Sequence, residues 1–144
     1  DYLPHNYDHN CVVYTGTHDN DTTIGWYYKL KEEDREFCDE YMNLERVTAD
    51  ELHWEFIRAA LSSVANLAVI PVQDYLALGS EGRINTPSTL GGNWDWRMKK
   101  DAFTKELAEE IRSVTGLYGR LPSEEEKTKE ALPSGVKGDA EAAG

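Results

Sequence analysis

The fold is decided by the stretch Asn66-Leu67-Ala68-Val69-Ile70-Pro71-Val72, an almost unbroken apolar run that ends at the polar pair Gln73-Asp74. A parallel strand covered on both faces has a continuous apolar sequence of this kind, whereas a strand with one face in water alternates apolar and polar residues. We therefore predict a parallel strand at 66–72 that is covered on both faces.

A second short strand is predicted upstream, at Cys11-Val12-Val13-Tyr14, where a β-branched and aromatic run stops at Thr15-Gly16-Thr17. Three segments have apolar residues at helical spacing: 31–43, the residues that follow the capping-box pattern Thr48-Ala49-Asp50-Glu51, and 101–114. The order strand, helices, strand, helix is typical of a parallel α/β sheet or barrel. A (β/α)8 barrel needs eight strands and roughly 250 residues, so two such units need further chain or are marginal alone.

The length of 144 residues, 40% of them hydrophobic, is enough for one modest core. We assign residues 1–121 to a globular unit and residues 122–144 to an acidic tail that is predicted to be disordered. No apolar run approaches the roughly 18 residues of a membrane-spanning helix, and no signal peptide is evident, so the sequence predicts a cytoplasmic protein. A first residue of Asp1 instead of Met suggests that the chain is cut from a longer one.

The charge balance disfavours two classes of partner. There are 15 Lys and Arg against 27 Asp and Glu, a formal net charge of -12, which repels nucleic acid phosphates and anionic membrane surfaces. Cys11 and Cys38 are the two cysteines, and neither belongs to a metal-binding pattern, so we predict reduced thiols and no cofactor.

The densest polar cluster is Tyr14-Thr15-Gly16-Thr17-His18-Asp19-Asn20-Asp21-Thr22, placed after a buried strand, where α/β folds hold their ligands. His18 and Asp19 are the candidate functional side chains. A structural alternative is that Asp19, Asn20 and Asp21 cap the next helix and shape a turn. A metal site at His18 and Asp19 is a further alternative, although the sequence offers no second set of ligands.

A second polar cluster follows the second strand. Gln73, Arg83 and Asn85 carry several hydrogen-bond donors and acceptors, which suit a ligand with many hydroxyl groups. For Glu81 we favour a structural role in an ion pair that stabilises the loop. The segment Asn93-Trp94-Asp95-Trp96-Arg97 offers either aromatic faces for sugar rings or a packing plug, and the sequence does not separate the two.

Several long motifs in one order carry a family resemblance. They are Y-T-G-T-H-D-N-D-T at 14–22, G-W at 25–26, I-P-V-Q-D at 70–74, L-G-S-E-G-R-I-N-T-P at 78–87 and N-W-D-W-R at 93–97. Together, from about Leu3 to Arg120, they resemble the C-terminal motifs of the amylomaltases, the 4-alpha-glucanotransferases of glycoside hydrolase family 77. The resemblance implies an α/β fold in which residues 1–121 form the C-terminal βα units of a (β/α)8 TIM-type barrel, completed by the remainder of that barrel.

The implied activity is the transfer of α-1,4-glucan segments from maltooligosaccharides and longer glucans to an acceptor sugar, with retention of anomeric configuration. Retention requires two carboxyl groups about 5 Å apart, a nucleophile and an acid/base. The resemblance assigns both to earlier strands, so we expect this chain alone to be inactive.

For this chain the resemblance implies that Asp19, with His18, holds ring hydroxyls of the sugar at the cleavage site, and that Asn85 binds glucan on the acceptor side. Trp26, Gln73 and Arg83 are the further predicted substrate-binding residues. Gly82, Ile84 and Ser88 depart from the family pattern, which leaves acceptor preference open. Two other hypotheses remain: a non-catalytic carbohydrate-binding module, and a metal-dependent hydrolase that uses His18 and Asp19. In a plant or alga the expected location would be the plastid.

Overall fold

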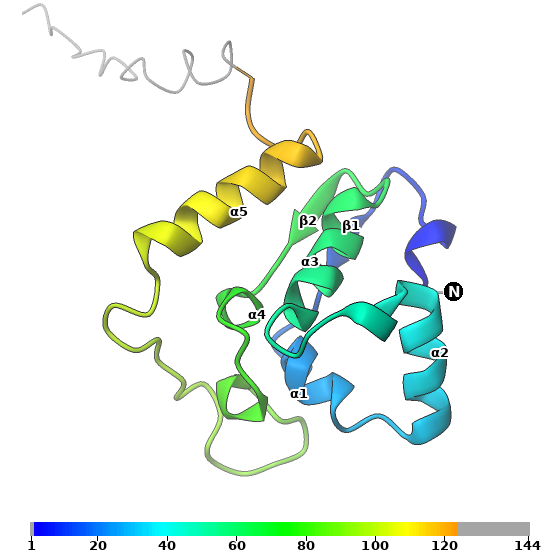
Figure 1. The fold of residues 1–144 in the computed structure, drawn as a ribbon. Helices are drawn as coiled ribbons and strands as arrows, with labels where there is room; N and C mark the ends of the chain where they lie inside the picture. Colours follow the sequence, from blue (N-terminus) through cyan, green and yellow to red (C-terminus); the bar gives the residue numbers. More distant parts are fainter. Residues whose placement is uncertain (1, 124–144) are drawn as a thin grey trace, which may run out of the picture.

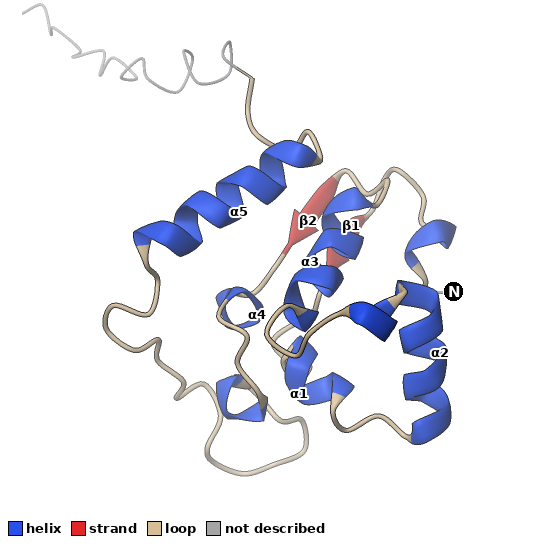
Figure 2. Ribbon diagram, in the orientation of Figure 1, coloured by secondary structure: helices blue, strands red, loops and turns tan. Residues whose placement is uncertain are grey.

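The computed structural model describes residues 2–123 and has an α/β fold built on two short parallel strands (Figures 1 and 2). In chain order its elements are η1 (Pro4–Asn6), β1 (Val12–Tyr14), α1 (Thr23–Tyr27), α2 (Glu32–Met42), η2 (Leu44–Arg46), α3 (Leu52–Ser62), β2 (Leu67–Val69), α4 (Val72–Tyr75), η3 (Ser80–Gly82) and α5 (Lys105–Leu117). The predicted order of strand, helices, strand and helix is confirmed. The predicted tail, 122–144, lies outside the described residues except for Pro122 and Ser123.

The second strand is shorter than predicted. β2 ends at Val69, and the chain then forms the single turn α4, whose N-cap is Pro71. Proline has no N–H to donate to a neighbouring strand, so it ends the strand in the middle of the apolar run. As a result Gln73 and Asp74 lie on a helical turn and not at the end of a strand.

One helix start and one predicted cap differ from the prediction, whereas α3 begins at Leu52, as expected. α5 begins at Lys105, four residues later than expected, because Thr104 caps it by accepting a hydrogen bond from the Leu107 N–H and Asp101 has a left-handed backbone (φ 63°). At α3 the predicted capping box is not formed. Thr48 Oγ1 contacts the Glu51 carboxylate instead of a backbone N–H, and α3 has no side-chain cap.

Helix α3 occupies the centre of the molecule and contributes to all three apolar clusters. One cluster joins Trp54, Ile57 and Leu61 to Val114 of α5. The other two join α3 to β1 and to α2; their buried members are Val13, Ala60, Ala65 and Cys38, Leu44, Leu52. Burial of apolar side chains is the main stabilising contribution here, and α3 is therefore the element on which the strands and the outer helices depend.

The strand pair has one covered face and one open face. Val13 pairs with Ala68, and both lie on the side packed with α3. On the other side Val12, Tyr14, Leu67 and Val69 are 44%, 47%, 55% and 37% exposed within the described chain. The prediction of a strand covered on both faces is thus wrong for this chain by itself, because residues 2–123 contain no element that packs on that second face.

Arg120 ties the end of α5 to the end of α3. Its guanidinium donates hydrogen bonds to the carbonyl oxygens of Leu61, Ser63 and Ala65 at 2.7 to 3.0 Å. The last carbonyls of a helix have no partner within the helix, and arginine can satisfy several at once.

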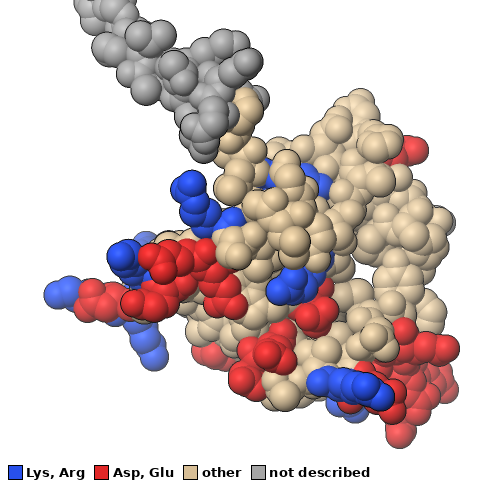
Figure 3. Space-filling model, turned by 45° about the horizontal axis from the view of Figure 1, so that its top comes forward, with Lys and Arg blue, Asp and Glu red and all other residues tan. Residues whose placement is uncertain are grey.

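The acidic charge is unevenly distributed. On the face drawn in Figure 3, acidic side chains gather over α2 and α5, at opposite sides of the molecule. The first turn of α2 carries Glu32, Glu33 and Asp34, which interact favourably with the positive end of the helix dipole. None of the helices within 2–123 is long and apolar enough to cross a membrane.

Candidate functional site

The polar loop after β1 is attached at both ends to one buried carboxylate. Thr15 Oγ1 donates to Asp74 Oδ2 (2.5 Å), and the Thr23 N–H donates to Asp74 Oδ1 (2.8 Å). Asp74 is 2% exposed, and the two bonds link residues 59 and 51 positions apart in the sequence. The loop 16–22 is therefore closed at its base by a residue from the turn that follows β2.

Inside this loop the structural alternative holds for some residues and not for others. Asn20 Oδ1 accepts hydrogen bonds from the backbone N–H and the hydroxyl of Thr17, which shapes the turn. Thr22 caps α1 by accepting from the Gly25 N–H (3.1 Å). The capping role proposed for the aspartates belongs to Thr22, and the Asp19 side chain is left free of it.

Asp21 is used structurally. Its carboxylate accepts hydrogen bonds from Lys29 Nζ (2.6 Å), Ser80 Oγ (2.8 Å) and the Thr22 N–H, and its side chain is 7% exposed. Burial alone would raise the pKa of Asp21, but these hydrogen bonds and the Lys29 charge outweigh it and lower the pKa below its ordinary value of 3.8. Gly25 makes room for this arrangement, because a Cβ there would stand 2.6 Å from Asp21 Oδ1 and from Ser80 Oγ.

Asp19 is the centre of a second group of contacts. Its Oδ1 accepts a hydrogen bond from Asn85 Nδ2 (2.6 Å) and lies 3.4 Å from His18 Nε2. Arg83 donates to the backbone oxygen of Asp19 (2.7 Å) and to that of Asn85 (2.9 Å). The side chains of Asp19 and His18 are 49% and 57% exposed, so a carboxylate and an imidazole stand side by side within reach of a ligand.

An aromatic ring completes this group. Trp94 packs against the His18 ring with centroids 5.2 Å apart, and its backbone N–H donates to the Ile84 oxygen (2.8 Å). Trp94 has a left-handed backbone (φ 65°), which is unusual for a large side chain and often accompanies functional sites. Trp94 is 58% exposed, so more than half of the residue stays accessible. The contact between Trp94 and His18 was not predicted, and no local pattern in the sequence signals it.

The remaining predicted residues differ in position. Gln73 is 4% exposed, and its amide nitrogen donates to the Gly82 oxygen (3.2 Å). Gln73 also lines a shallow pocket with Gly16, Thr17, His18, Asn20, Asp21, Thr22, Pro71, Asp74, Gly82, Arg83 and Ile84. Trp26 lies on α1, where its ring and that of Phe56 pack edge to face with centroids 5.9 Å apart, and it is not part of that pocket lining. The structure brings together His18, Asp19, Arg83 and Asn85, keeps Gln73 beneath them, and leaves Trp26 apart.

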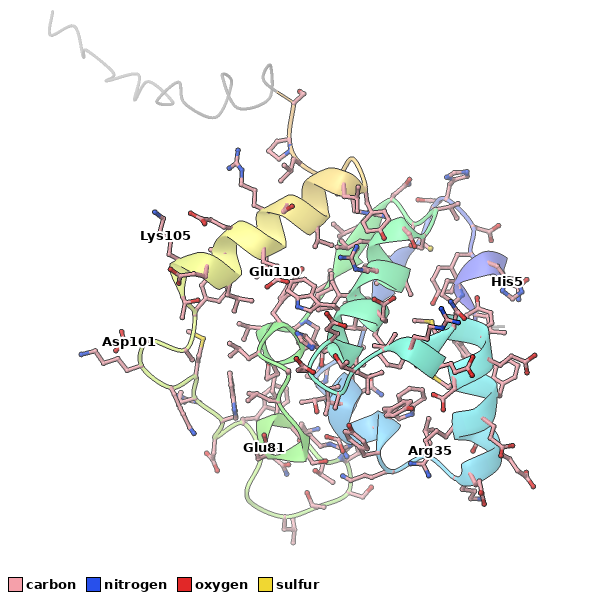
Figure 4. All side chains as sticks on the ribbon, in the orientation of Figure 1. His5, Arg35, Glu81, Asp101, Lys105 and Glu110 are labelled. Carbon is pink, nitrogen blue, oxygen red and sulfur yellow. The ribbon has the colours of Figure 1, made fainter. Side chains whose placement is uncertain are left out.

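Glu81 has a local structural role. Figure 4 labels it on η3, where its carboxylate accepts a hydrogen bond from the Gly79 N–H (3.0 Å). The predicted ion pair with Arg83 is not formed, because the Arg83 guanidinium donates to backbone oxygens instead. Within residues 2–123 no group of three or more His, Cys, Asp or Glu side chains is arranged as a metal site.

Comparisons with known proteins agree with one another. A sequence model of a family described as 4-alpha-glucanotransferase matches residues 1–104. The chain is 52% identical over 121 residues to a 4-alpha-glucanotransferase of Clostridium butyricum and 42% identical over 125 residues to one of Thermus thermophilus. A relative in Arabidopsis thaliana, 45% identical over 123 residues, is described as chloroplastic/amyloplastic. Each of these matches covers 83% of this chain and 21–25% of the relative, so the chain spans about a quarter of their length.

A solved structure is similar as well. The amylomaltase from Streptococcus agalactiae in complex with acarbose matches with a TM-score of 0.78 and 32% sequence identity. The match covers 83% of this chain and 24% of that structure.

Proposed function

This chain belongs to the 4-alpha-glucanotransferase family, and from that membership we propose that it is part of an enzyme that transfers α-1,4-glucan segments to an acceptor sugar such as glucose or a maltodextrin. The observation that carries the proposal is the half-exposed Asp19 carboxylate, which accepts a hydrogen bond from Asn85 and lies beside the His18 ring, and His18 in turn lines the pocket. Support for a glucan-like ligand comes from the related amylomaltase, whose structure is a complex with acarbose.

We propose further that the two βα units belong to a (β/α)8 barrel whose other strands come from chain outside residues 1–144. The open face of the sheet supports this, because covering the apolar side chains of Val12, Tyr14, Leu67 and Val69 with further strands would be favourable. In a closed barrel that face would point inward and be filled by side chains of the other strands.

In the proposed reaction a nucleophilic carboxylate attacks the anomeric carbon while the acid/base protonates the departing glycosidic oxygen. An acceptor hydroxyl then attacks the glycosyl-enzyme, and the acid/base takes its proton. The family resemblance assigns both of those groups to chain outside residues 1–144. Asp19 and His18 would bind ring hydroxyls of the sugar, with contacts that strengthen as the ring distorts toward the oxocarbenium-like transition state.

The other predicted glucan-binding residues receive different roles. Asn85 is the best supported, because it stands beside Asp19 and lies on the loop that follows η3. Gln73 supports that loop from below through Gly82. Trp26, 45% exposed, is proposed as an aromatic surface for a more distant part of the glucan. For location we propose the cytoplasm, or the plastid in a plant or alga, as the name of the Arabidopsis relative indicates for that protein.

The test is a maltotriose disproportionation assay with a full-length chain that contains this segment. Glucose and longer maltodextrins are expected as products, with no activity from residues 1–144 alone. Asp19→Asn keeps the shape of the side chain and removes its charge, so turnover should fall by roughly 100-fold or more. Asp8→Asn, the same change at an exposed residue before β1, serves as the matched control.

Two results would contradict the proposal. Near-normal turnover of Asp19→Asn would remove the role assigned to Asp19. A full-length chain that binds acarbose but never redistributes maltotriose would instead support the non-catalytic carbohydrate-binding module.

A further inference from the structure

We infer that Arg83 is a positioning residue, which fixes the spacing between Asp19 and Asn85 and does not itself bind the glucan. The inference rests on the proposed function, and it narrows the sequence prediction, which grouped Arg83 with the substrate-binding residues. Its basis is that Arg83 donates to the backbone oxygens of both residues while their side chains bond to each other (2.6 Å).

These contacts form a closed ring between two distant segments. Arg83 Nε donates to the Asn85 oxygen (2.9 Å), two residues ahead, and its Nη2 donates to the Asp19 oxygen (2.7 Å), 64 residues away in the sequence. With its backbone oxygen occupied by Arg83, Asp19 has a fixed peptide orientation. Its carboxylate can then face Asn85 and solvent.

The base of Arg83 is itself held in place. The preceding residue, Gly82, is buried, and its carbonyl accepts a hydrogen bond from the buried amide of Gln73. The backbone N–H of Arg83 donates to the Ser80 oxygen (3.1 Å), which closes η3. The backbone of Arg83 is thus held by hydrogen bonds, and its guanidinium bonds to two backbone oxygens. Arg83 therefore acts as a brace between the turn after β2 and the loop after β1.

Arginine suits this role better than lysine. The guanidinium is planar and carries donors in a fixed fork, so one side chain can reach two carbonyl oxygens in different directions. A lysine ammonium is a single point with one stem, and in this geometry it would reach one of the two oxygens. No salt bridge joins Arg83 to the Asp19 carboxylate among the described residues, so the brace acts on the backbone and does not neutralise the carboxylate.

The consequence for catalysis is a selective effect on turnover. Displacing a contact group by about 1 Å can cost roughly 100-fold in rate, because contacts to the transition state depend on position. Arg83→Met, in a full-length chain that contains this segment, should lower kcat for maltotriose by roughly 10- to 100-fold and change KM by less than roughly 3-fold. Arg83→Lys should also lower kcat with little change in KM, but by a smaller factor. Arg112→Met, at an exposed arginine of α5, is the matched control and should behave as the parent.

A double-mutant cycle separates positioning from general support. If Arg83 acts through Asp19, then Arg83→Met should cost much less in an Asp19→Asn background than in the parent. An equal loss in both backgrounds would mean that Arg83 merely supports the fold. A raised KM with unchanged kcat would mean that Arg83 binds substrate. Either of these results would overturn the inference.

Hydrogen exchange decides the matter without using activity. Arg83→Met and Arg83→Lys should speed amide exchange in the peptide that covers 15–23, whereas Arg112→Met should not. Unchanged exchange in the two Arg83 variants would refute the brace. If the parent chain shows no disproportionation, the proposed function fails, and the exchange result still establishes whether Arg83 holds Asp19.

Discussion

Replacing Asp74 by alanine is expected to loosen the loop that carries His18 and Asp19, because Asp74 holds both ends of that loop. The substitution removes the hydrogen bonds from Thr15 Oγ1 and from the Thr23 N–H. Thr23 is 4% exposed, so its N–H would lose its partner in a place that water reaches poorly.

The magnitude follows from the nature of the two bonds. Hydrogen bonds to a charged group contribute about 1.5 to 3 kcal/mol each, so the pair contributes about 3 to 6 kcal/mol. Water that enters the space left by the side chain recovers part of this, and we expect the opening free energy of the loop to fall by about 3 kcal/mol. Asp74→Asn should cost about 1 kcal/mol, because its amide can still accept from Thr23 and donate to the Thr15 hydroxyl.

The assay is hydrogen exchange of the peptide 15–23 in the full-length chain, together with the maltotriose assay. A loss of about 3 kcal/mol corresponds to roughly 100-fold faster exchange where exchange follows local opening. Turnover should fall in both variants, and it should fall further in Asp74→Ala than in Asp74→Asn. The matched control is Asp39→Asn, since Asp39 also accepts a hydroxyl hydrogen bond, from Tyr27 (2.7 Å), but lies on α2. Unchanged exchange and turnover in Asp74→Ala would refute the reasoning, because the loop would then be held by other contacts.

Three further predictions concern single residues. Gly25→Ala should destabilise the protein by about 1 to 3 kcal/mol, measured by urea unfolding, since the new Cβ would displace the Asp21 carboxylate; an unchanged midpoint would show that the side chain moves at no cost. Burial, with the hydrogen bond to Asp39, raises the pKa of Tyr27 from 10.0 to about 12. Between pH 10 and about 12 the folded state therefore keeps a proton that the unfolded state loses. The contribution of Tyr27 to the free energy of unfolding is complete below pH 10 and declines between pH 10 and about 12. Tyr27→Phe should flatten the fall in unfolding free energy over that window, and equal slopes would contradict the shift. Asn85→Ala should weaken the use of acceptor sugars by roughly 10-fold in kcat/KM, measured with a series of acceptors, and unchanged kinetics for every acceptor would refute its role.

The fold was largely predictable because its signals are local. The apolar runs at 11–14 and 66–72 and the helical spacing after Glu51 depend only on neighbouring residues. The end of β2 at Val69, two residues before Pro71, could have been predicted on the same grounds, since a proline inside an apolar run is itself a local signal. The open face of the sheet was not predictable from the run, because a continuous apolar sequence does not say whether the covering elements lie in the same chain.

The site was predictable as a region and not as a set of contacts. Polar clusters after the two strands indicated His18, Asp19 and Asn85 as candidate residues, and the structure brings the three together. Which donor meets which acceptor depends on geometry across 50 or more positions, as for Asp74 with Thr23. The sequence offers several carboxylates and several donors of similar chemistry, so it does not show which carboxylate accepts from which donor.

The different contacts of three aspartates carry information about function. Asp19, Asp21 and Asp74 surround one loop, but the carboxylates of Asp21 and Asp74 have structural roles. Asp74 is fully buried and holds the loop. Asp21 pairs with Lys29, and its pKa is lowered. Asp19 alone of the three keeps a half-exposed carboxylate, and its nearest cationic group is the imidazole of His18, which carries charge only when protonated. The proposed binding of ring hydroxyls is favoured by a carboxylate that is not already paired with a lysine or an arginine. This is the physical reason for proposing Asp19 for the chemical role, and it agrees with the contact of Arg83, which bonds to the backbone oxygen of Asp19 and not to its carboxylate.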